Sequence, residues 1–372
     1  MGTQYRLDIH SAAGTPRSQL IGSADSAPPG ARAGFLELAY SRKVNEPGQL
    51  TFLLDGDNAA IAALEDRAII KVWRRNAELG IPWYRDFTGL YLDQERTYTD
   101  HGLFKASCPG ALWLLGTRYI LYFAGVANRT MFTGVAAETI MKMLIDYNAS
   151  ANATVANGRM RTPNTLGITI AGDLGLGTVR SWACTWDNLL TSLQDLARVG
   201  GGDFDLVNIG GAAWEFRFYP GQLGTDRSAG VTFALEYGNM RTPVYKRTRN
   251  REATVAVVGA DGVGAARNIT VRTGTDYSVT NDIEIFVNDT NATTATARQA
   301  SGDKALRERQ AEHEFSFDVI QEGARIYGRD YFLGDLVRAR YDVIEVTRKI
   351  AGIAIGWKPG GEETVSVEMS QV

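Results

Sequence analysis

Three histidines supply the only imidazole groups with which this chain could do acid–base or metal chemistry, and they lie far apart at His10, His101 and His313. None has a cysteine or an acidic residue at the spacing of a metal site. We interpret them as surface residues and expect no metal and no cofactor. The two cysteines, Cys108 and Cys184, are too few for a disulfide framework and are expected to be buried small apolar side chains.

Two pairs of carboxylates have a spacing that could serve glycoside hydrolysis. Asp203 and Asp205 are two residues apart, as are Asp93 and Glu95. In an extended segment this spacing places both groups of a pair on one face. Two facing carboxylates are what most glycosidases use. The same pattern arises on any solvated strand face, and we favour that interpretation.

Phosphate-binding and nucleophile motifs are missing from the sequence. Residues 55–58 resemble the start of a calcium loop, but the twelfth position is Asp66 and not Glu. The glycine-rich stretches at 172–177 and 259–264 lack the Lys-Ser/Thr of a phosphate loop. The second stretch leads into another strand, which predicts a hairpin turn. No Gly-x-Ser-x-Gly elbow is present, so we predict that the protein is not an enzyme.

Composition and charge indicate a globular protein with two or three domains. The chain has 372 residues, with 44% hydrophobic and 22% charged residues. Its net charge of −3 is evenly spread: residues 119–228, for example, carry 8 basic and 9 acidic side chains. Proteins that grip phosphate backbones usually have a basic excess in some domain. The dense basic run at 246–251 could meet an acidic or nucleic-acid partner, but a solvated loop is the preferred interpretation.

No stretch of the sequence resembles a membrane-spanning segment or a signal peptide. No window approaches 18 consecutive apolar residues, and the N-terminus has no apolar core of signal-peptide length. We therefore expect a protein that is made in the cytosol and has no membrane span.

The stretch from 71 to 116 is predicted to form the wall around which the chain is organised. Apolar and aromatic residues alternate there, which predicts a meander of three strands with two tight connections. Because Arg74 and Arg75 are adjacent, a strand sends them to opposite faces, and one should reach a neighbouring chain. The candidate subunit-interface residues are Trp73, Arg74, Arg75, Trp83 and Tyr84.

The N-terminal and middle parts of the chain differ in pattern. About six strands and a short helix at 58–65 are expected within 1–118, with a turn at 45–48 in which Gly48 takes a positive φ. Residues 134–148 have helical periodicity. A second helix follows Thr185 as its cap, and a hairpin lies at 204–218. The run at 149–180 has little periodicity, and we expect it to be the first site of limited proteolysis.

The C-terminal third returns to strands, with one charged helix at 292–313. The predicted fold is therefore mainly β with an α+β insertion, in which two tube-like β-barrel domains flank a small α+β domain. The expected boundaries are 1–118, 119–228 and 229–372.

Several segments together resemble the baseplate-hub, or tail-tip hub, proteins of long-tailed bacteriophages. They are Asn45 to Phe52 before an acidic loop, Val72-Trp73-Arg74-Arg75 followed by Phe87 to Tyr91, and Arg309 to Val319 with Tyr327 to Val337. The resemblance spans most of the chain and rests on these patterns, with no active-site motif. Many relatives carry a long C-terminal extension for host contact or cell-wall digestion, whereas this chain ends at Val372 after its last strand.

The resemblance implies a structural protein of the virion that assembles in the host cytoplasm. In that family two tube-like β domains per subunit form a homotrimeric ring with pseudo-sixfold symmetry. The ring joins the hexameric tail tube and distal tail protein to a trimeric tip or fibre, next to the tape measure protein. DNA would only pass through its lumen. The rival hypothesis is a carbohydrate-binding or carbohydrate-degrading β protein of the tail tip, with Trp83, Tyr84 or Trp214 as sugar platforms.

Overall fold

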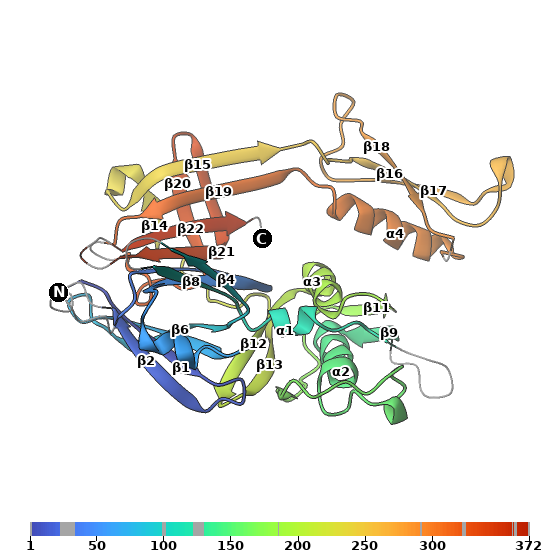
Figure 1. Cartoon of the computed structure of the whole chain (residues 1–372). Coiled ribbons are helices and arrows are strands. Elements are labelled where there is room, and N and C mark those ends of the chain that lie inside the picture. Colours follow the sequence, from blue (N-terminus) through green and yellow to red (C-terminus); the bar gives the residue numbers. More distant parts are fainter. Residues whose placement is uncertain are drawn as a thin grey trace. The chain divides into compact units, whose positions relative to one another are not determined.

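The computed structural model describes residues 2–22, 34–98, 102–121, 130–184, 186–290, 292–321, 325–358, 360 and 363–370. By contacts the chain separates into two compact units, which are described one at a time. The first comprises Met1–Pro243 and Phe317–Ser370, and the second comprises Val244–Ser316. Figure 1 labels the elements of both.

The first unit contains a four-stranded antiparallel sheet in the order β2-β1-β5-β6. Its strands are β1 (Gln4–His10), β2 (Pro16–Gly22), β5 (Ile69–Asn76) and β6 (Ile81–Leu90). Along β1, every second residue is fully buried, including Tyr5, Leu7 and Ile9. This alternation is the burial pattern of a sheet with one face on a core.

A larger sheet joins strands from the two ends of the chain. Its main order is β15-β19-β22-β21-β3-β4-β8-β7, and β14 and β20 extend it beside β21. The junction is the antiparallel pair β21–β3, in which Ala354 lies opposite Ser41. The strands are β3 (Glu37–Lys43), β4 (Glu46–Asp55), β7 (Asp93–Thr97), β8 (Leu103–Pro109), β14 (Thr232–Ala234), β15 (Met240–Thr248), β19 (Glu312–Val319), β20 (Leu336–Tyr341), β21 (Ile344–Trp357) and β22 (Thr364–Ser370).

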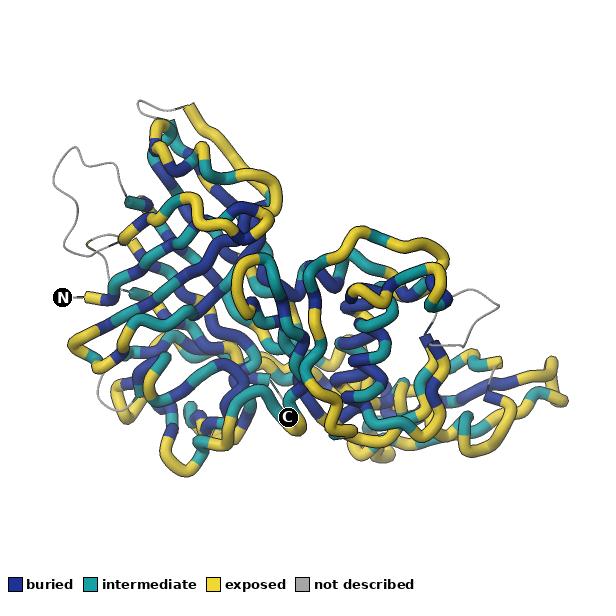
Figure 2. The backbone as a smooth tube through the Cα atoms, turned by 90° about the horizontal axis from the view of Figure 1, so that it is seen from below, coloured by how far each residue is buried: buried dark blue, intermediate teal, exposed yellow. Residues whose placement is uncertain are grey.

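Aromatic side chains fill the space between these two sheets. The ring of Tyr5 lies 5.6 Å from Trp357 and 6.3 Å from Tyr40, and Tyr40 lies 5.9 Å from Phe87. These centroid distances are in the range at which rings pack edge-on or tilted. Figure 2 shows buried and more exposed positions alternating along the strands. The prediction of a mainly β fold is confirmed, and within the described residues the strands form separate sheets and not a closed barrel.

The central wall differs from the predicted meander. The strands β5 and β6 form the expected antiparallel hairpin, but β8 pairs with β4 and β7 in the larger sheet. In the sequence, β7 lies between β6 and β8; it is a fully exposed strand that includes Asp93 and Glu95. Period-two patterning gives the strands but not their partners, which explains the error.

The turn at 45–48 is also resolved more finely than predicted. Residues Val44 and Asn45 make the tight turn between β3 and β4, with Asn45 at φ 60°. Gly48 has φ 65°, as predicted, but it lies within β4. A Cβ on Gly48 would lie 2.3 Å from the carbonyl oxygen of Ser41, so glycine is required there by space as well as by φ.

The rest of the first unit is an α+β part whose helices pack on small sheets. Its elements are α1 (Trp113–Gly116), β9 (Met131–Ala136), α2 (Ala137–Ala149), η2 (Val155–Asn157), β10 (Ile168–Ile170), β11 (Val179–Ala183), α3 (Leu189–Gly200), β12 (Gly202–Gly210) and β13 (Ala213–Pro220). One hydrophobic core unites α2, α3 and the β12–β13 hairpin, and it includes Ile140, Leu193 and Phe216. The predicted helices and hairpin are therefore confirmed.

Two local predictions in this part need correction. The cap of α3 is Asn188, whose side chain accepts a hydrogen bond from the N–H of Thr191, whereas Thr185 lies outside the described residues. The run at 149–180 contains regular structure: η2, and β10 in parallel register with β13. Ile168 of β10 is buried in the core, which its short apolar segment alone could not predict.

The second unit is a three-stranded sheet with one helix. The sheet has the order β17-β16-β18, built from β16 (Val255–Gly259), β17 (Ile269–Thr273) and β18 (Glu284–Asn288). Helix α4 (Ala295–Arg307) packs on it through Leu306 against Ala256. As predicted, residues 259–264 connect two antiparallel strands, and the short helix η4 (Gly264–Ala266) lies in that connection. The remaining short helices are η1 (Ala59–Ala63) and η3 (Leu235–Tyr237).

Candidate functional site

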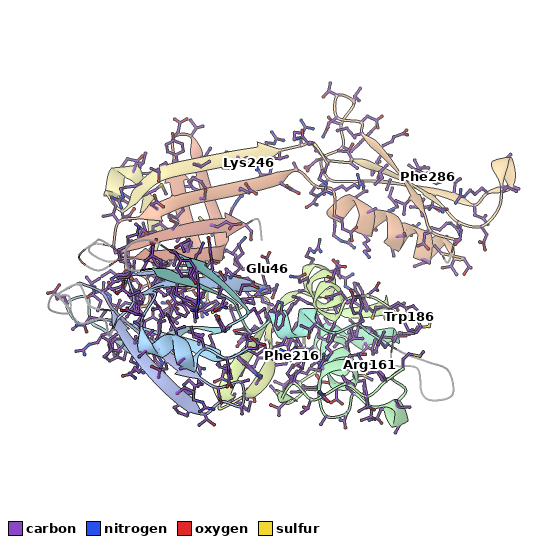
Figure 3. The ribbon with its side chains drawn as sticks, viewed as in Figure 1. Glu46, Arg161, Trp186, Phe216, Lys246 and Phe286 are labelled. Carbon is purple, nitrogen blue, oxygen red and sulfur yellow. The ribbon has the colours of Figure 1, made fainter. Side chains whose placement is uncertain are left out.

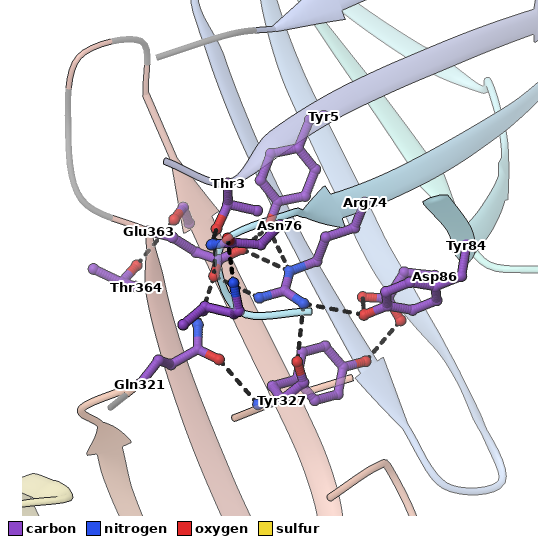
Figure 4. A network of polar contacts seen from close by, with 12 residues as sticks. Thr3, Tyr5, Arg74, Asn76, Tyr84, Asp86, Gln321, Tyr327, Glu363 and Thr364 are labelled. Atoms are coloured by element: carbon purple, nitrogen blue, oxygen red, sulfur yellow. Dashed lines mark hydrogen bonds and ion pairs between the residues drawn. The ribbon is translucent and has the colours of Figure 1, made fainter. Parts of the chain in front are cut away.

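A buried network of charged and hydroxyl groups lies between the two ends of the chain (Figure 4). At its centre Arg74 of β5 is fully buried and pairs with Glu363, just before β22. Arg74 Nε and Nη2 donate to the two carboxylate oxygens of Glu363 at 2.7 and 2.6 Å. Nη1 donates to the backbone oxygen of Tyr327 at 3.0 Å. This two-pronged geometry is the strongest form of an arginine–carboxylate contact.

Neighbouring polar groups complete the surroundings of this ion pair. The Tyr5 hydroxyl donates to Glu363, and so does the Gln321 amide. Burial opposes the charge of Arg74, but the contacts with Tyr5 and Glu363 outweigh it and raise the pKa of Arg74. Arg74 therefore stays charged, and its hydrogen bonds to Glu363 tie β5 to the C-terminal strands.

Asp86 of β6 is the second carboxylate of the network, and its side chain is fully buried. It accepts hydrogen bonds from the hydroxyls of Tyr40 at 2.6 Å and Tyr327 at 2.7 Å, and from Arg42 Nη1 at 2.9 Å. Burial, together with the charge of Asp86, raises the pKa values of Tyr40, Tyr84 and Tyr327. These tyrosines therefore act as neutral hydrogen-bond donors and not as acid–base groups at neutral pH.

The five candidate interface residues lie on both faces of the β5–β6 hairpin. Arg74 and Tyr84 face inward, where Tyr84 accepts a hydrogen bond from Arg74 at 3.3 Å. Trp73 and Arg75 are partly buried and alternate with buried positions of β5, and Trp83 of β6 is also partly buried. The side chain of Arg74 is fully used within its own chain, so the expectation that an adjacent arginine reaches a neighbour now concerns Arg75.

The outer face of this hairpin carries a stack of aromatic and cationic groups. The guanidinium of Arg6 in β1 lies 4.7 Å from the ring centre of Trp73 and 5.4 Å from that of Trp83. Cation–π contacts at these distances fix long side chains in one geometry. The result is a preorganised surface on the strands that the sequence singled out.

The carboxylates that could have formed a hydrolytic pair have different roles. Asp203 is buried and accepts from Lys349 Nζ at 2.9 Å and from Asn45 at 3.0 Å. Asn45 in turn accepts from the N–H of Phe204 at 2.8 Å. This cluster attaches the β12–β13 hairpin to the β3–β4 turn. Burial raises the pKa of Asp205. The other carboxylate of the pair, Asp203, forms an ion pair with Lys349 and is not a free acid or nucleophile.

A polar cavity of about 250 Å³ lies beside these contacts in the first unit. It is lined in part by Arg42, Arg85, Asp86, Asp205 and Asn208. The guanidinium of Arg85 donates to the backbone oxygen of Asn208 at 2.7 Å. The side chains that line the cavity include no histidine, cysteine or serine.

Possible metal ligands, the two cysteines and the lengths of the helices are the remaining features of the described residues. No group of three or more His, Cys, Asp or Glu side chains could hold a metal ion in the part of the chain that the structure covers. Cys108 and Cys184 are buried and unpaired with each other, and burial raises the pKa of Cys184 to about 12. None of the described helices is long and apolar enough to cross a membrane. His101 lies outside the described residues.

Two corrections concern sugar platforms and the network itself. Trp214 is only 2% exposed and packs in the core of the α+β part, so it cannot serve as a platform. The partners Asp86, Tyr327 and Glu363 were not predicted as functional residues. They are far from Arg74 in the sequence, and no local spacing marks residues that only the sheet brings together.

Known proteins with related folds include tail proteins of prophage or bacterial origin. The chain is 14% identical to the prophage MuSo2 43 kDa tail protein from Shewanella oneidensis, with a TM-score of 0.61, and the match covers 99% of this chain and 98% of that one. A tail protein from Neisseria meningitidis MC58 matches with a TM-score of 0.58 and 10% identity over 100% and 97% of the two chains. A chain of the Francisella PdpA-VgrG complex matches with a TM-score of 0.57 and 7% identity, over 99% of this chain but 52% of that one.

These structural likenesses establish the fold, and a family model establishes the family. No curated protein sequence matches the chain. The model for the Siphovirus ReqiPepy6 Gp37-like protein matches residues 30–369, which is most of the chain. The chain therefore belongs to the Siphovirus ReqiPepy6 Gp37-like family, and its fold is similar to that of prophage and bacterial tail proteins.

Proposed function

We propose that three copies of this protein form a hub ring at the tail tip. The ring would join the hexameric tail tube and distal tail protein to a trimeric tip, and DNA would pass through its lumen. The observation that carries this proposal is the large sheet that contains strands from both ends of the chain. The Arg74–Glu363 pair locks this sheet to the β5–β6 hairpin, and a wall fixed in this way resists deformation when DNA passes.

The fold of related proteins supports the same role. Tail proteins from two prophage or bacterial sources match nearly the whole of this chain. We retain three domains in the proposal: tube-like β domains at 1–118 and 229–372, and the α+β domain at 119–228. The neighbours in the assembly would be the distal tail protein, the tape measure protein and a downstream tip or fibre protein.

The contact between subunits would use the outer face of the β5–β6 hairpin. Trp73, Arg75 and Trp83 belong to the residue types that dominate binding energy at protein interfaces. The stacked guanidinium of Arg6 already orders both indole rings. Less side-chain entropy is therefore lost when a neighbour covers them.

The proposed role needs no catalysis. The network hydroxyls are held neutral by burial, and Asp203 is paired with Lys349. A net charge of −3 also suits a conduit that lets DNA pass without holding it. Of the three sugar platforms in the rival role, which is to bind or degrade carbohydrate at the tip, Trp83 remains, because Trp214 is buried and Tyr84 faces the inner network.

Native mass spectrometry of the purified protein with its distal tail protein tests the proposal. We expect a species that contains three copies of the 40.6 kDa chain. Changing Trp73 and Trp83 together to alanine should shift this species to single chains. The matched control is Tyr98→Ala, which removes an aromatic side chain that is 92% exposed. A single chain that binds tail-tip oligosaccharides would support the rival instead.

A further inference from the structure

The α+β part of the first unit contains a group of arginines without carboxylate partners. Arg118 follows α1, and Arg159 and Arg161 lie between η2 and β10. Arg159 is only 3% exposed. Its Nη1 and Nη2 donate to the backbone oxygens of Arg161 at 2.9 Å and Tyr119 at 3.2 Å. Arg118 Nη2 donates to the backbone oxygen of Asn164 at 2.9 Å.

The charges of this group are not neutralised within the described residues. Arg118, Arg159 and Arg161 form no ion pair there, and the Nε atoms of Arg118 and Arg159 are buried without a hydrogen-bond partner. Burial, followed by the charges of Arg118 and Arg161, lowers the pKa of Arg159 to about 10. Burial and the charges of Arg161 and Arg67 lower the pKa of Arg118. Like charges held together with desolvated N–H groups create a strong preference for an anion.

The surface beside these arginines carries exposed apolar side chains. Tyr119 is 53% exposed, Met160 is 52% exposed and Trp186 is 57% exposed. The N–H of Trp186 donates to the backbone oxygen of Ile120, the residue after Tyr119, at 2.9 Å. Trp186 has φ 69°, a left-handed conformation that residues other than glycine rarely adopt. Figure 3 labels Arg161 and Trp186 in this part of the structure.

We propose that Arg118 and Arg161 bind a carboxylate of an acidic segment in a partner protein, with the charge of the buried Arg159 behind them, while Tyr119, Met160 and Trp186 contact the apolar residues of that segment. Tryptophan, tyrosine, methionine and arginine are the residue types enriched at the centre of protein interfaces. The arginine fork matches a carboxylate with two parallel hydrogen bonds. This site is separate from the outer face of β5 and β6 and does not depend on the proposed ring.

The distribution of charge favours a protein partner over a nucleic acid. Residues 118–228 carry 9 basic and 9 acidic side chains, so this part of the chain has no basic excess. A nucleic acid needs such a surface, because several phosphates are contacted in a row. A compact cation site with apolar neighbours fits a single acidic side chain that is flanked by apolar ones.

Calorimetry with the full chain at low ionic strength tests this proposal. The probe is a short synthetic peptide that alternates Glu with Leu, and the comparison probes are its Gln-for-Glu counterpart, oligothymidylate and inorganic phosphate. We expect the Glu peptide to bind with a tryptophan fluorescence change, and the Gln peptide and oligothymidylate not to bind. Arg161→Glu should weaken binding of the Glu peptide by about tenfold or more, since it replaces an attraction by a repulsion.

Controls separate a binding role from a structural one. Arg161 is exposed, so Arg161→Glu should keep the melting temperature of the parent protein. Arg198→Glu makes the same change of charge on α3, at a side chain that is 64% exposed, and should leave peptide binding unchanged. Arg161→Lys should retain part of the affinity.

Three outcomes would overturn the proposal. They are a Glu peptide that does not bind, a Gln peptide that binds equally well, and an Arg161→Glu variant that binds like the parent. Tighter binding of oligothymidylate or phosphate than of the Glu peptide would also overturn it, in favour of a phosphate site. Loss of binding in Arg161→Glu with unchanged melting would support it.

Discussion

Two buried arginines of the first unit, Arg74 and Arg159, show how the same side chain can serve two purposes. Arg74 is fully buried, donates two hydrogen bonds to the carboxylate of Glu363, and has a raised pKa. Arg159 is almost as buried, but within the described residues it donates to backbone oxygens and pairs with no carboxylate, and its pKa is lowered to about 10. A paired buried charge holds the fold together, whereas an unpaired one has its favourable interaction still to make.

The largest effect that we predict is a loss of folding stability at high pH, caused by the buried tyrosines around Arg74. Burial keeps Tyr5, Tyr40, Tyr84 and Tyr327 protonated in the folded state, with pKa values above the usual 10. Above pH 10 the unfolded chain releases these protons and the folded chain does not, so the stability that is present below pH 10 falls as pH rises. The loss is about 1.4 kcal/mol per tyrosine for one pH unit.

Urea unfolding at pH 8 and pH 11, monitored by tyrosinate absorbance, measures this effect. The four tyrosines together should lower the free energy of unfolding by roughly 6 kcal/mol over one pH unit above pH 10. Tyr40→Phe should make the loss smaller. Full tyrosinate absorbance before unfolding would contradict the closed character of the network.

Removing the partner of the paired arginine should be nearly as damaging. Glu363→Ala leaves Arg74 buried without a carboxylate, and such a change typically costs about 3–5 kcal/mol. Equilibrium unfolding measures it, with Glu345→Ala as the control because Glu345 and Arg338 form an exposed pair at 3.8 Å. The control should cost less than about 1 kcal/mol. Equal effects of the two variants would show that burial of the pair is not what matters.

The attachment of the α+β part should have an intermediate effect. Asp203→Asn removes the charge that pairs with Lys349 at 2.9 Å, while the amide can still meet Asn45. We expect a loss of about 1–3 kcal/mol and no change in catalytic behaviour, because the protein should not hydrolyse polysaccharide or peptidoglycan. A turnover that disappears in Asp203→Asn or Asp205→Asn would overturn the structural role.

The unpaired arginine should matter least for stability. Arg159→Met loses two hydrogen bonds to backbone oxygens but also removes a buried unpaired charge, so the net change should lie within about 1 kcal/mol. Comparing its unfolding curve with that of Glu363→Ala sharpens the contrast. A loss as large as that of Glu363→Ala would mean that Arg159 holds the fold and is not held ready for an anion.

Local patterns of apolar residues predict helices and strands more reliably than they predict which strands pair with one another. The alternation at Tyr5, Leu7 and Ile9 predicts β1, and the apolar stripe of Leu189, Leu193 and Leu196 predicts α3. These patterns depend on neighbours within one element, which the sequence displays directly.

The sheet partners and the polar network could not be predicted in the same way. Glu363 lies 289 positions from Arg74, and Asp86 lies 241 positions from Tyr327. Only the pairing of β21 with β3 brings these groups into reach. An adjacent pair such as Arg74 and Arg75 shows that the two face opposite ways, but not which of them faces inward.

Electron cryomicroscopy of the tail tip tests the proposed hub role most directly. We predict three copies of this chain in a closed ring, with Trp73 and Trp83 covered by a neighbouring subunit and the large sheet facing the lumen. One copy, six copies, or a ring in which both indole rings face solvent would contradict it.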